Sequence, residues 1–277
     1  MVTGFYEVFW VFLIYSFLGW CMEVTYAAVC NGTFVNRGFL NGPVCPIYGV
    51  GVLLVIGLLW PLKDNALILF VGSVIVTTVL EFLVGWVLEK LFHDKWWDYS
   101  DLPFNIKGYV CLKFSLLWGI ACMLIVRVIH PSIMALIRWV PHLPGVIVGA
   151  ALGAVFIGDL IITVIAVRKL SIRLHALEEL DRALDNLSET IGEELSERVL
   201  TLQEKADILG EQLESSKAKA EDLRDELKAR SQKLLEQSSY IHERIMKAYP
   251  QLGHQNHAAI MERLEDLREE RKKNRRK

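Results

Sequence analysis

Four apolar stretches, each long enough to cross a bilayer as a helix, dominate the first 167 residues of the chain. They cover residues 5–29, 66–88, 109–129 and 146–167. The hydrocarbon core of a membrane requires about 20 mostly apolar residues in helical form. Residues 47–60 form a fifth, shorter apolar stretch. We therefore predict a helical membrane domain of about five spans at residues 1–167.

Residues 131–144 interrupt this pattern because they contain three prolines, together with Arg138 and Trp139. A charged group and an indole ring both favour the boundary between lipid and water. We predict that this segment is a helix lying in the membrane interface, before the last span.

A different spacing begins at residue 195, where apolar residues recur in alternating steps of four and three. This is the pattern of a coiled coil, and it predicts a homo-oligomer or a partner helix through residues 195–234. An unbroken helix from residue 170 to residue 249 would be about 120 Å long. Of the twelve seam positions ten are apolar, and the seam consists of Leu195, Val199, Leu202, Ala206, Leu209, Leu213, Ser216, Ala220, Leu223, Leu227, Arg230 and Leu234.

Charged residues are divided unevenly between the two parts of the chain. Residues 1–167 contain 8 Lys and Arg and 9 Asp and Glu, whereas residues 168–277 contain 22 and 23. The first composition is typical of a membrane domain and the second of a solvated helix. The sequence thus predicts an all-α protein. Its polytopic helical membrane domain is followed by a long cytoplasmic coiled-coil helix at residues 168–249 and a short helix with a basic terminus at residues 250–277.

Basic residues indicate the orientation in the membrane. Arg168, Lys169 and Arg173 directly follow the last span, and such clusters stay on the cytoplasmic side. With five spans the N-terminus is outside, and the loops at residues 30–46 and 89–108 face the cytoplasm. We expect a multi-pass protein of the cell membrane with a cytoplasmic tail.

Two parts of the membrane domain resemble each other at an offset of 66 residues. We predict two parallel repeat units, at about residues 5–60 and 66–129, each consisting of a helix, a cytoplasmic loop and a return helix. Close helix packing is the alternative explanation of the repeated glycines. The matching pairs are Gly19 and Gly85, Trp20 and Trp86, Glu23 and Glu89, Gly42 and Gly108, Val44 and Val110, and Cys45 and Cys111.

The segment NRGFLNGPVCPIYG, residues 36–49, is too rich in Gly, Asn and Pro to form a regular helix. Non-helical backbone at membrane depth is tolerated where it is buried in protein or lines a watery cavity, so we predict a partly re-entrant loop. Its counterpart is WWDYSDLPFNIKG at residues 96–108. The asparagines could bind a ligand or cap helices. The candidate loop site consists of Asn36, Asn41, Cys45, Trp97, Asp98, Tyr99 and Asn105.

Carboxylates within the apolar spans form a second candidate site. Placing a charge at the centre of a span costs about 3 kcal/mol on insertion scales, so it usually faces a partner or water. We predict one polar cluster in which Lys113 or Arg37 partners the acids. Separate ion pairs that fix the helix register are the alternative. The cluster consists of Glu23, Arg37, Glu81, Glu89, Lys113 and Asp159.

Several motifs follow one another in an order that resembles a known family: GWCMEV, FVNRGFLNGPVCPIYG, LEFLVGW, WWDYSDLPFN and GYVCLKFSLLWG. The chain resembles the bacterial membrane proteins named ABC-transporter type IV, or CmpB-like, over about residues 5–130. The resemblance implies a role related to transport, but brings no established substrate or catalytic residues. The coiled-coil tail lies outside it.

Motifs for ATP hydrolysis are missing from the sequence. There is no G-x-x-x-x-G-K-[ST] phosphate loop, so a permease would need a separate ATPase or an ion gradient. Zinc-binding spacings are also missing. We expect no enzymatic activity and no cofactor. Two functions remain: a permease-like transport subunit of unknown substrate, or a non-transporting scaffold that oligomerises or recruits partners through its tail.

The last seven residues, Arg271 to Lys277, include six basic side chains. Near an acidic membrane each such charge contributes about 1 kcal/mol to binding. Contact with anionic lipid, contact with nucleic acid and a solvated terminus are all compatible with this composition.

Overall fold

A computed structural model describes residues 4–201, 222–223, 225–227, 229–230, 240–249 and 252 of the chain. This part is mostly helical, in agreement with the predicted all-α membrane protein. Most of the predicted coiled-coil seam and the whole basic segment 271–277 lie outside the described residues.

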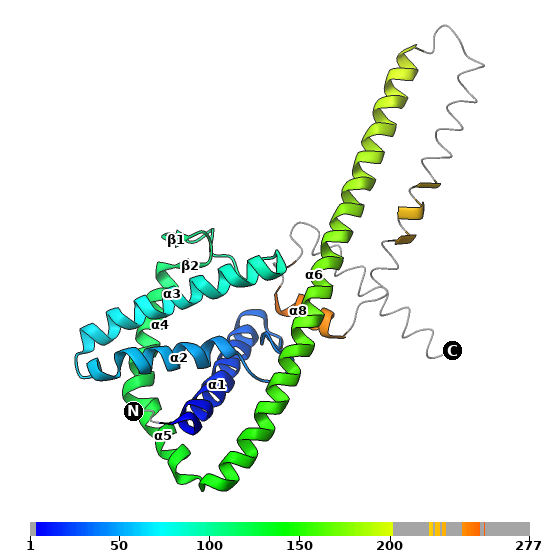
Figure 1. Ribbon diagram of the computed structural model, residues 1–277. Coiled ribbons are helices and arrows are strands. Elements are labelled where there is room, and N and C mark those ends of the chain that lie inside the picture. The colour runs from blue at the N-terminus through cyan, green and yellow to red at the C-terminus, as the bar shows by residue number, and fades with distance from the viewer. Residues whose placement is uncertain are drawn as a thin grey trace. The chain divides into compact units, whose positions relative to one another are not determined.

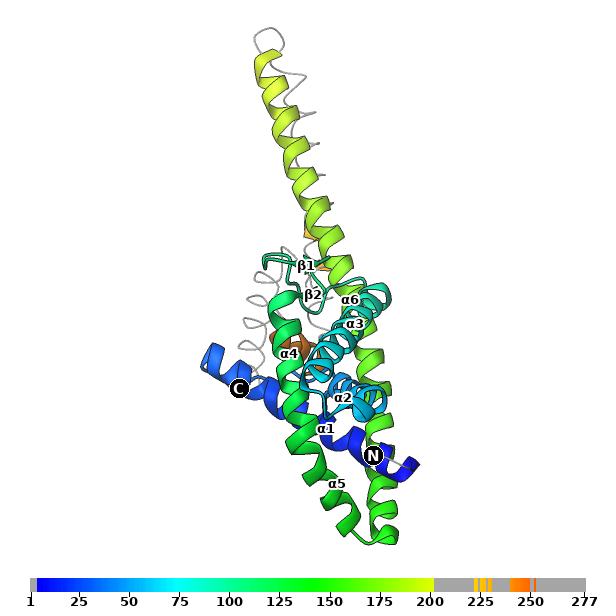
Figure 2. The same cartoon turned by 90° about the vertical axis from the view of Figure 1, so that its left-hand side faces the viewer.

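The described part of the chain consists of helices and one antiparallel pair of short strands (Figure 1). Figure 2 shows the same elements from the side. In chain order they are α1 (Phe5–Asn31), α2 (Pro46–Leu59), η1 (Trp60–Leu62), α3 (Ala66–Phe92), β1 (Asn105–Ile106), β2 (Val110–Cys111), α4 (Leu112–Leu124), η2 (Ile125–Ile129), α5 (His130–Trp139), α6 (His142–Thr201) and α8 (Tyr240–Ala248).

Four helical segments are long and apolar enough to cross a membrane: Phe5–Cys30, Ala66–Phe92, Leu112–Trp139 and His142–Leu177. They coincide with the four long apolar stretches of the sequence. The helix at Pro46–Leu62 is shorter. The fifth span therefore remains a prediction, and so does the orientation derived from an odd number of spans.

Two helix ends of the membrane domain follow from single residues. Asn65 begins α3 because its side-chain oxygen accepts the backbone N–H groups of Leu67 and Ile68, both at 3.1 Å. Gly32 ends α1 with a φ of 68°, a left-handed conformation that costs glycine little. Each residue thus fixes one end of a candidate span.

A π-helical turn, η2, joins α4 to α5 without a break in the helical chain. Pro131 lies just after this turn. In a regular α-helix its ring would clash with the carbonyl four residues earlier, and the wider π-turn relieves that contact. By length and composition, α5 belongs to the candidate span Leu112–Trp139. Its expected position in the membrane interface remains a prediction.

The first four long helices pack as two hairpins, α1 against α2 and α3 against α4, and α2 also packs against α3. Glycines allow the close approach. A Cβ atom on Gly19 would clash with the ring of Tyr48, and one on Gly49 would clash with Ser16 and the carbonyl of Phe12. These hairpins coincide with the two predicted repeat units, although the repeat itself remains a prediction.

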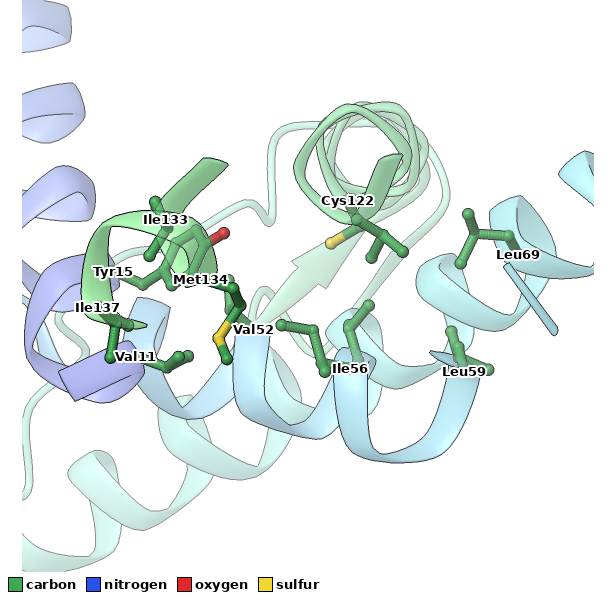
Figure 3. Close-up of a cluster of buried hydrophobic side chains, with 12 residues drawn as sticks. Val11, Tyr15, Val52, Ile56, Leu59, Leu69, Cys122, Ile133, Met134 and Ile137 are labelled. Carbon is green, nitrogen blue, oxygen red and sulfur yellow. The ribbon is translucent and has the colours of Figure 1, made fainter. Parts of the chain in front are cut away.

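An apolar core ties α5 to these hairpins, and Figure 3 shows side chains from five helices converging in it. Burial of such side chains is the main favourable term wherever helices exclude water or lipid from each other. The members drawn and labelled are Val11 and Tyr15 from α1, Val52, Ile56 and Leu59 from α2, Leu69 from α3, Cys122 from α4, and Ile133, Met134 and Ile137 from α5.

The membrane part of α6 packs on α1 through small residues. Gly149 and Gly153 lie against the ring of Phe9, and the rings of Phe12 and Phe156 meet edge to face at 5.4 Å. Small residues let helix backbones approach closely in a membrane. This contact places Asp159, one turn further along α6, beside the loop that follows α1.

The chain divides into two compact units. One contains residues 1–168 together with residues 241–252, and the other contains residues 169–240 and 253–277. Within the second unit α6 continues as helix to Thr201, past Gly192. The sequence places residues 240–249 at the end of a long tail helix, whereas the structure packs 241–249 into the membrane unit. Most of the chain between α6 and α8 lies outside the described residues, so the continuous tail helix remains a prediction.

Candidate functional site

Asp159 on α6 holds the loop between α1 and α2 through hydrogen bonds to backbone and side chain. Its carboxylate accepts the backbone N–H of Asn41 at 3.2 Å and that of Gly42 at 2.7 Å. The side-chain amide of Asn41 donates to Asp159 at 2.8 Å and to the hydroxyl of Thr163 at 2.9 Å. Hydrogen bonds to a charged acceptor are stronger than neutral ones. Asp159 therefore fixes the position of the loop.

Asn36 organises the same loop from within. Its side-chain oxygen accepts the indole N–H of Trp20 at 2.7 Å and the backbone N–H of Gly38 at 3.1 Å. Its side-chain amide donates to the carbonyl of Asn41 at 3.1 Å. These bonds satisfy polar groups of the irregular loop backbone, so Asn36 holds the loop together and does not cap a helix.

Glu23 on α1 lies between Tyr48 and Arg37. It accepts a hydrogen bond of 2.6 Å from the hydroxyl of Tyr48, and Arg37 Nε lies 3.7 Å from its other oxygen. Both charged side chains remain partly exposed, each at 29%. Arg37 is thus the basic partner that the structure brings to Glu23.

Glu81 on α3 is the second carboxylate of this region. It accepts a hydrogen bond of 3.3 Å from the hydroxyl of Tyr99, which belongs to the loop after α3. Glu23 lies close enough to act electrostatically on both Glu81 and Tyr99. Burial, and next the charge of Glu81, raise the pKa of Tyr99, so its hydroxyl stays protonated and available as a donor. Two carboxylates from different hairpins are therefore neighbours, each with one tyrosine.

One oxygen of Glu81, Oε2, is buried and has no hydrogen-bond partner among the described residues. The same holds for Oε2 of Glu89. A buried acceptor without a partner is costly, and such atoms often mark a site that water, an ion or a ligand completes. Within the described chain, these two carboxylate oxygens are therefore the acceptors at which water, an ion or a ligand could bind.

Glu89 lies two helical turns after Glu81, near the end of α3, where it forms a hydrogen bond with Tyr109. Lys113 at the start of α4 is exposed, and its amine lies over the ring of Phe114 at 5.8 Å. Among the described residues Lys113 forms no ion pair with an acid. The structure thus distributes the six candidate residues over four places: Glu23 with Arg37 and Glu81, Glu89 with Tyr109, Asp159 at the loop, and Lys113 apart from the acids.

The loop between α3 and α4 is held by its own polar residues. Asp98 accepts the backbone N–H of Ser100 at 2.9 Å and the amine of Lys95 at 3.2 Å. Although burial raises the pKa of Asp98, these donors outweigh it and lower that pKa overall. Asn105 donates to the carbonyls of Ser100 and Leu102, and Trp97 donates to the carbonyl of Tyr109 at 2.8 Å. Asp98, Trp97 and Asn105 therefore shape this loop, and Tyr99 points its hydroxyl to Glu81.

The loop between α1 and α2, which we call the first loop, ends at Cys45. The thiol of Cys45 is buried, and its backbone N–H donates to the carbonyl of Ser16 at 2.9 Å. Burial, and next the charge of Glu23, raise the pKa of Cys45 to about 12. A thiol that stays protonated is a poor metal ligand and a poor nucleophile. Within the described residues no group of three His, Cys, Asp or Glu side chains could hold a metal ion.

Sequence reasoning missed several residues that complete the two loops. Phe39 of the first loop packs against Trp96 of the loop between α3 and α4, which we call the second loop, and their ring centroids are 5.1 Å apart. Trp96 also meets Tyr249, which follows α8, at 4.6 Å. Tyr48 lies in an apolar helix, where an aromatic residue is usually a packing residue. Its position at the end of the segment 36–49, in the first turn of α2, was the available signal.

The sequence model of the family described as "Putative ABC-transporter type IV" matches residues 10–164. The match covers α1 to α5 and the first part of α6, including both loops and all six acidic and basic candidate residues. It leaves out the tail and α8. No solved structure matches the chain.

Proposed function

The chain belongs to the family described as "Putative ABC-transporter type IV", and we propose that it is a permease-like subunit of a transport system. The proposed ligand site lies where the loops after α1 and α3 meet, and it faces the cytoplasm. Sites of this kind in transporters lie between structural repeats, beside interrupted helices. Within the proposal the two helix hairpins are the parts between which a solute binds.

The buried oxygen Oε2 of Glu81 is the single observation that carries this proposal. If Glu81 served only to fix the helix register, both of its oxygens would be expected to have protein partners. Glu23 lies nearby, and Arg37 is the only cation in a described ion pair with either carboxylate. An excess of acid over base suits a cationic solute or a solute that exchanges protons.

The energy source is part of the proposal. Because the sequence has no phosphate-binding loop, a separate ATPase or an ion gradient drives the transport. The proposal assigns no enzymatic activity and no cofactor to the chain. Self-association through residues 195–234 and contact of residues 271–277 with anionic lipid remain predictions about its assembly.

Substitution of Glu81 tests the site. The full chain in proteoliposomes is screened by solid-supported membrane electrophysiology against inorganic cations, amines and amino acids. We expect one solute class to give a current that Glu81→Gln lowers at least tenfold and Glu23→Gln also lowers. Asp64→Asn is the matched control, because Asp64 is exposed in the connection between η1 and α3. Equal currents in Glu81→Gln and Asp64→Asn would contradict the proposed site.

A scaffold is the second candidate function, and the length of α6 favours it. This helix continues to Thr201, well beyond the candidate span that ends at Leu177. A helix that extends so far can present a surface to a partner. If the native chain shows no response to any solute while removal of the tail abolishes a pulled-down complex, the scaffold replaces the permease.

A further inference from the structure

Arg244 of α8 lies in a cradle of backbone carbonyls on the first loop. Its Nη1 donates to the carbonyls of Gly38 at 2.7 Å and Asn36 at 3.4 Å, and its Nη2 donates to the carbonyl of Phe39 at 3.1 Å. The side chain is buried. A planar guanidinium can reach three carbonyls at once, whereas the amine of a lysine cannot match this geometry. The cradle is therefore specific for arginine.

Tyr249, one residue beyond α8, extends this contact to the second loop. Its hydroxyl donates to the carbonyl of Arg37 at 2.6 Å, and its ring packs on Trp96. The segment thus touches both of the loops that frame Glu23 and Glu81. On α8, Ile245, Met246 and Ala248 are also buried, whereas Lys247 is exposed.

The first loop is held from two sides by opposite charges. Asp159 binds the N–H groups of Asn41 and Gly42, and Arg244 binds the carbonyls of residues 36, 38 and 39. Arg37, the partner of Glu23, lies within the Arg244 attachment, between Asn36 and Gly38, and its own carbonyl accepts the hydroxyl of Tyr249. The backbone that carries Arg37 therefore depends on whether α8 is docked.

Docking and helix formation are coupled in α8. The described part of this helix, Tyr240–Ala248, has nine residues, and isolated helices shorter than about 12 residues are marginal in water. Release from the loop would remove both its apolar contacts and its carbonyl cradle. A released α8 is expected to unfold, so that the docked and released forms are two distinct states.

We propose that α8 is a plug in cis, anchored by Arg244, that closes the entry between the two loops and opens it on release. The docking itself is independent of the proposed transport function, and only the consequence of opening rests on that function. Regulation by the tail follows directly, because any partner that binds residues 240–252 competes with the membrane domain for them.

Hydrogen exchange of the full chain in lipid nanodiscs tests the docking. We expect Arg244→Ala to speed exchange of the amides at residues 38–42 and maleimide labelling of Cys45 at least tenfold. Arg244→Lys should give an intermediate effect, because it keeps the positive charge but loses the two guanidinium nitrogens that donate to the three carbonyls. Lys247→Ala is the matched control, since it removes an exposed positive charge from the same helix. Equal behaviour of Arg244→Ala and Lys247→Ala overturns the plug.

Exchange in α3, around the buried residue Leu69, shows whether Arg244→Ala has unfolded the domain. If it has, Tyr249→Phe replaces it, because this variant removes one hydroxyl contact and should raise exchange at residues 36–38 at least twofold. No change in that variant overturns the plug.

A photo-cross-linker at residue 247, in a mixture of two differently tagged copies, distinguishes docking in cis from docking between copies. Cross-links within one chain support the plug, and cross-links between chains overturn it. A solute current that increases in Arg244→Ala supports plug and permease together. Faster exchange without any solute current supports the plug and counts against the permease.

Discussion

Asp159 on α6 and Gly42 in the loop after α1 are joined by a 2.7 Å hydrogen bond although 117 positions separate them in the sequence. A carboxylate within a span is costly unless it has partners. Here the partners are backbone N–H groups that the glycine- and proline-rich loop cannot use in a helix. The acid and the irregular loop therefore satisfy each other.

Replacement of Asp159 should loosen this loop. We expect Asp159→Ala to lower the free energy of unfolding by about 2 kcal/mol, because hydrogen bonds to a charged acceptor are lost. Asp159→Asn should cost less, since it keeps one acceptor oxygen. Melting curves in detergent measure the effect, with Asp64→Ala as the control. A shift no larger than that of the control would show that Asp159 does not stabilise the fold.

The contact between α1 and α2 depends on Gly49. We expect Gly49→Ala to destabilise the protein by about 1–3 kcal/mol, because the added methyl group would overlap Ser16 and the backbone of Phe12. Gly57→Ala in the same helix is the control, since nothing lies within 4 Å of the position of its Cβ. Thermal unfolding of both variants should place Gly49→Ala below the native protein and Gly57→Ala at or above it.

The thiol of Cys45 should be unreactive over the whole neutral range. Its pKa is raised to about 12 by burial, so the neutral form predominates at every pH below that value. At pH 8 about one thiol in ten thousand is then a thiolate. Maleimide labelling followed by mass spectrometry should modify the exposed Cys30 rapidly and Cys45 only after unfolding. Labelling of both at similar rates in the native protein would contradict the buried environment.

The long apolar stretches predicted most of the fold, because a bilayer imposes the same length and composition on every span. The loop residues were also identifiable, since Pro43 blocks a continued helix and Gly42 and Asn36 disfavour one. Their bonding partners were not. No sequence pattern indicates that Asp159 and Asn41 form hydrogen bonds, because this contact arises from the packing of α6 on α1.

The docking of α8 was hidden by the coiled-coil pattern. Ile241, Ile245, Ala248 and Leu252 are again spaced by four, three and four residues, although Ile245 and Leu252 lie one position off the register of the upstream seam. Such spacing describes an apolar face on a helix, but it does not specify the surface that covers the face. A second helix and the membrane domain are equally compatible with it, and the structure selects the membrane domain for residues 241–252.

The π-turn at Ile125–Ile129 accommodates one residue more than a regular α-helix would use for the same rotation. Each residue of an α-helix turns the chain by about 100°. If the same residues were wound as a regular α-helix, the extra residue would rotate all of α5 about its axis by that angle. Ile133, Met134 and Ile137 would then leave the core and face lipid. The π-turn therefore determines which side of α5 is the inner one.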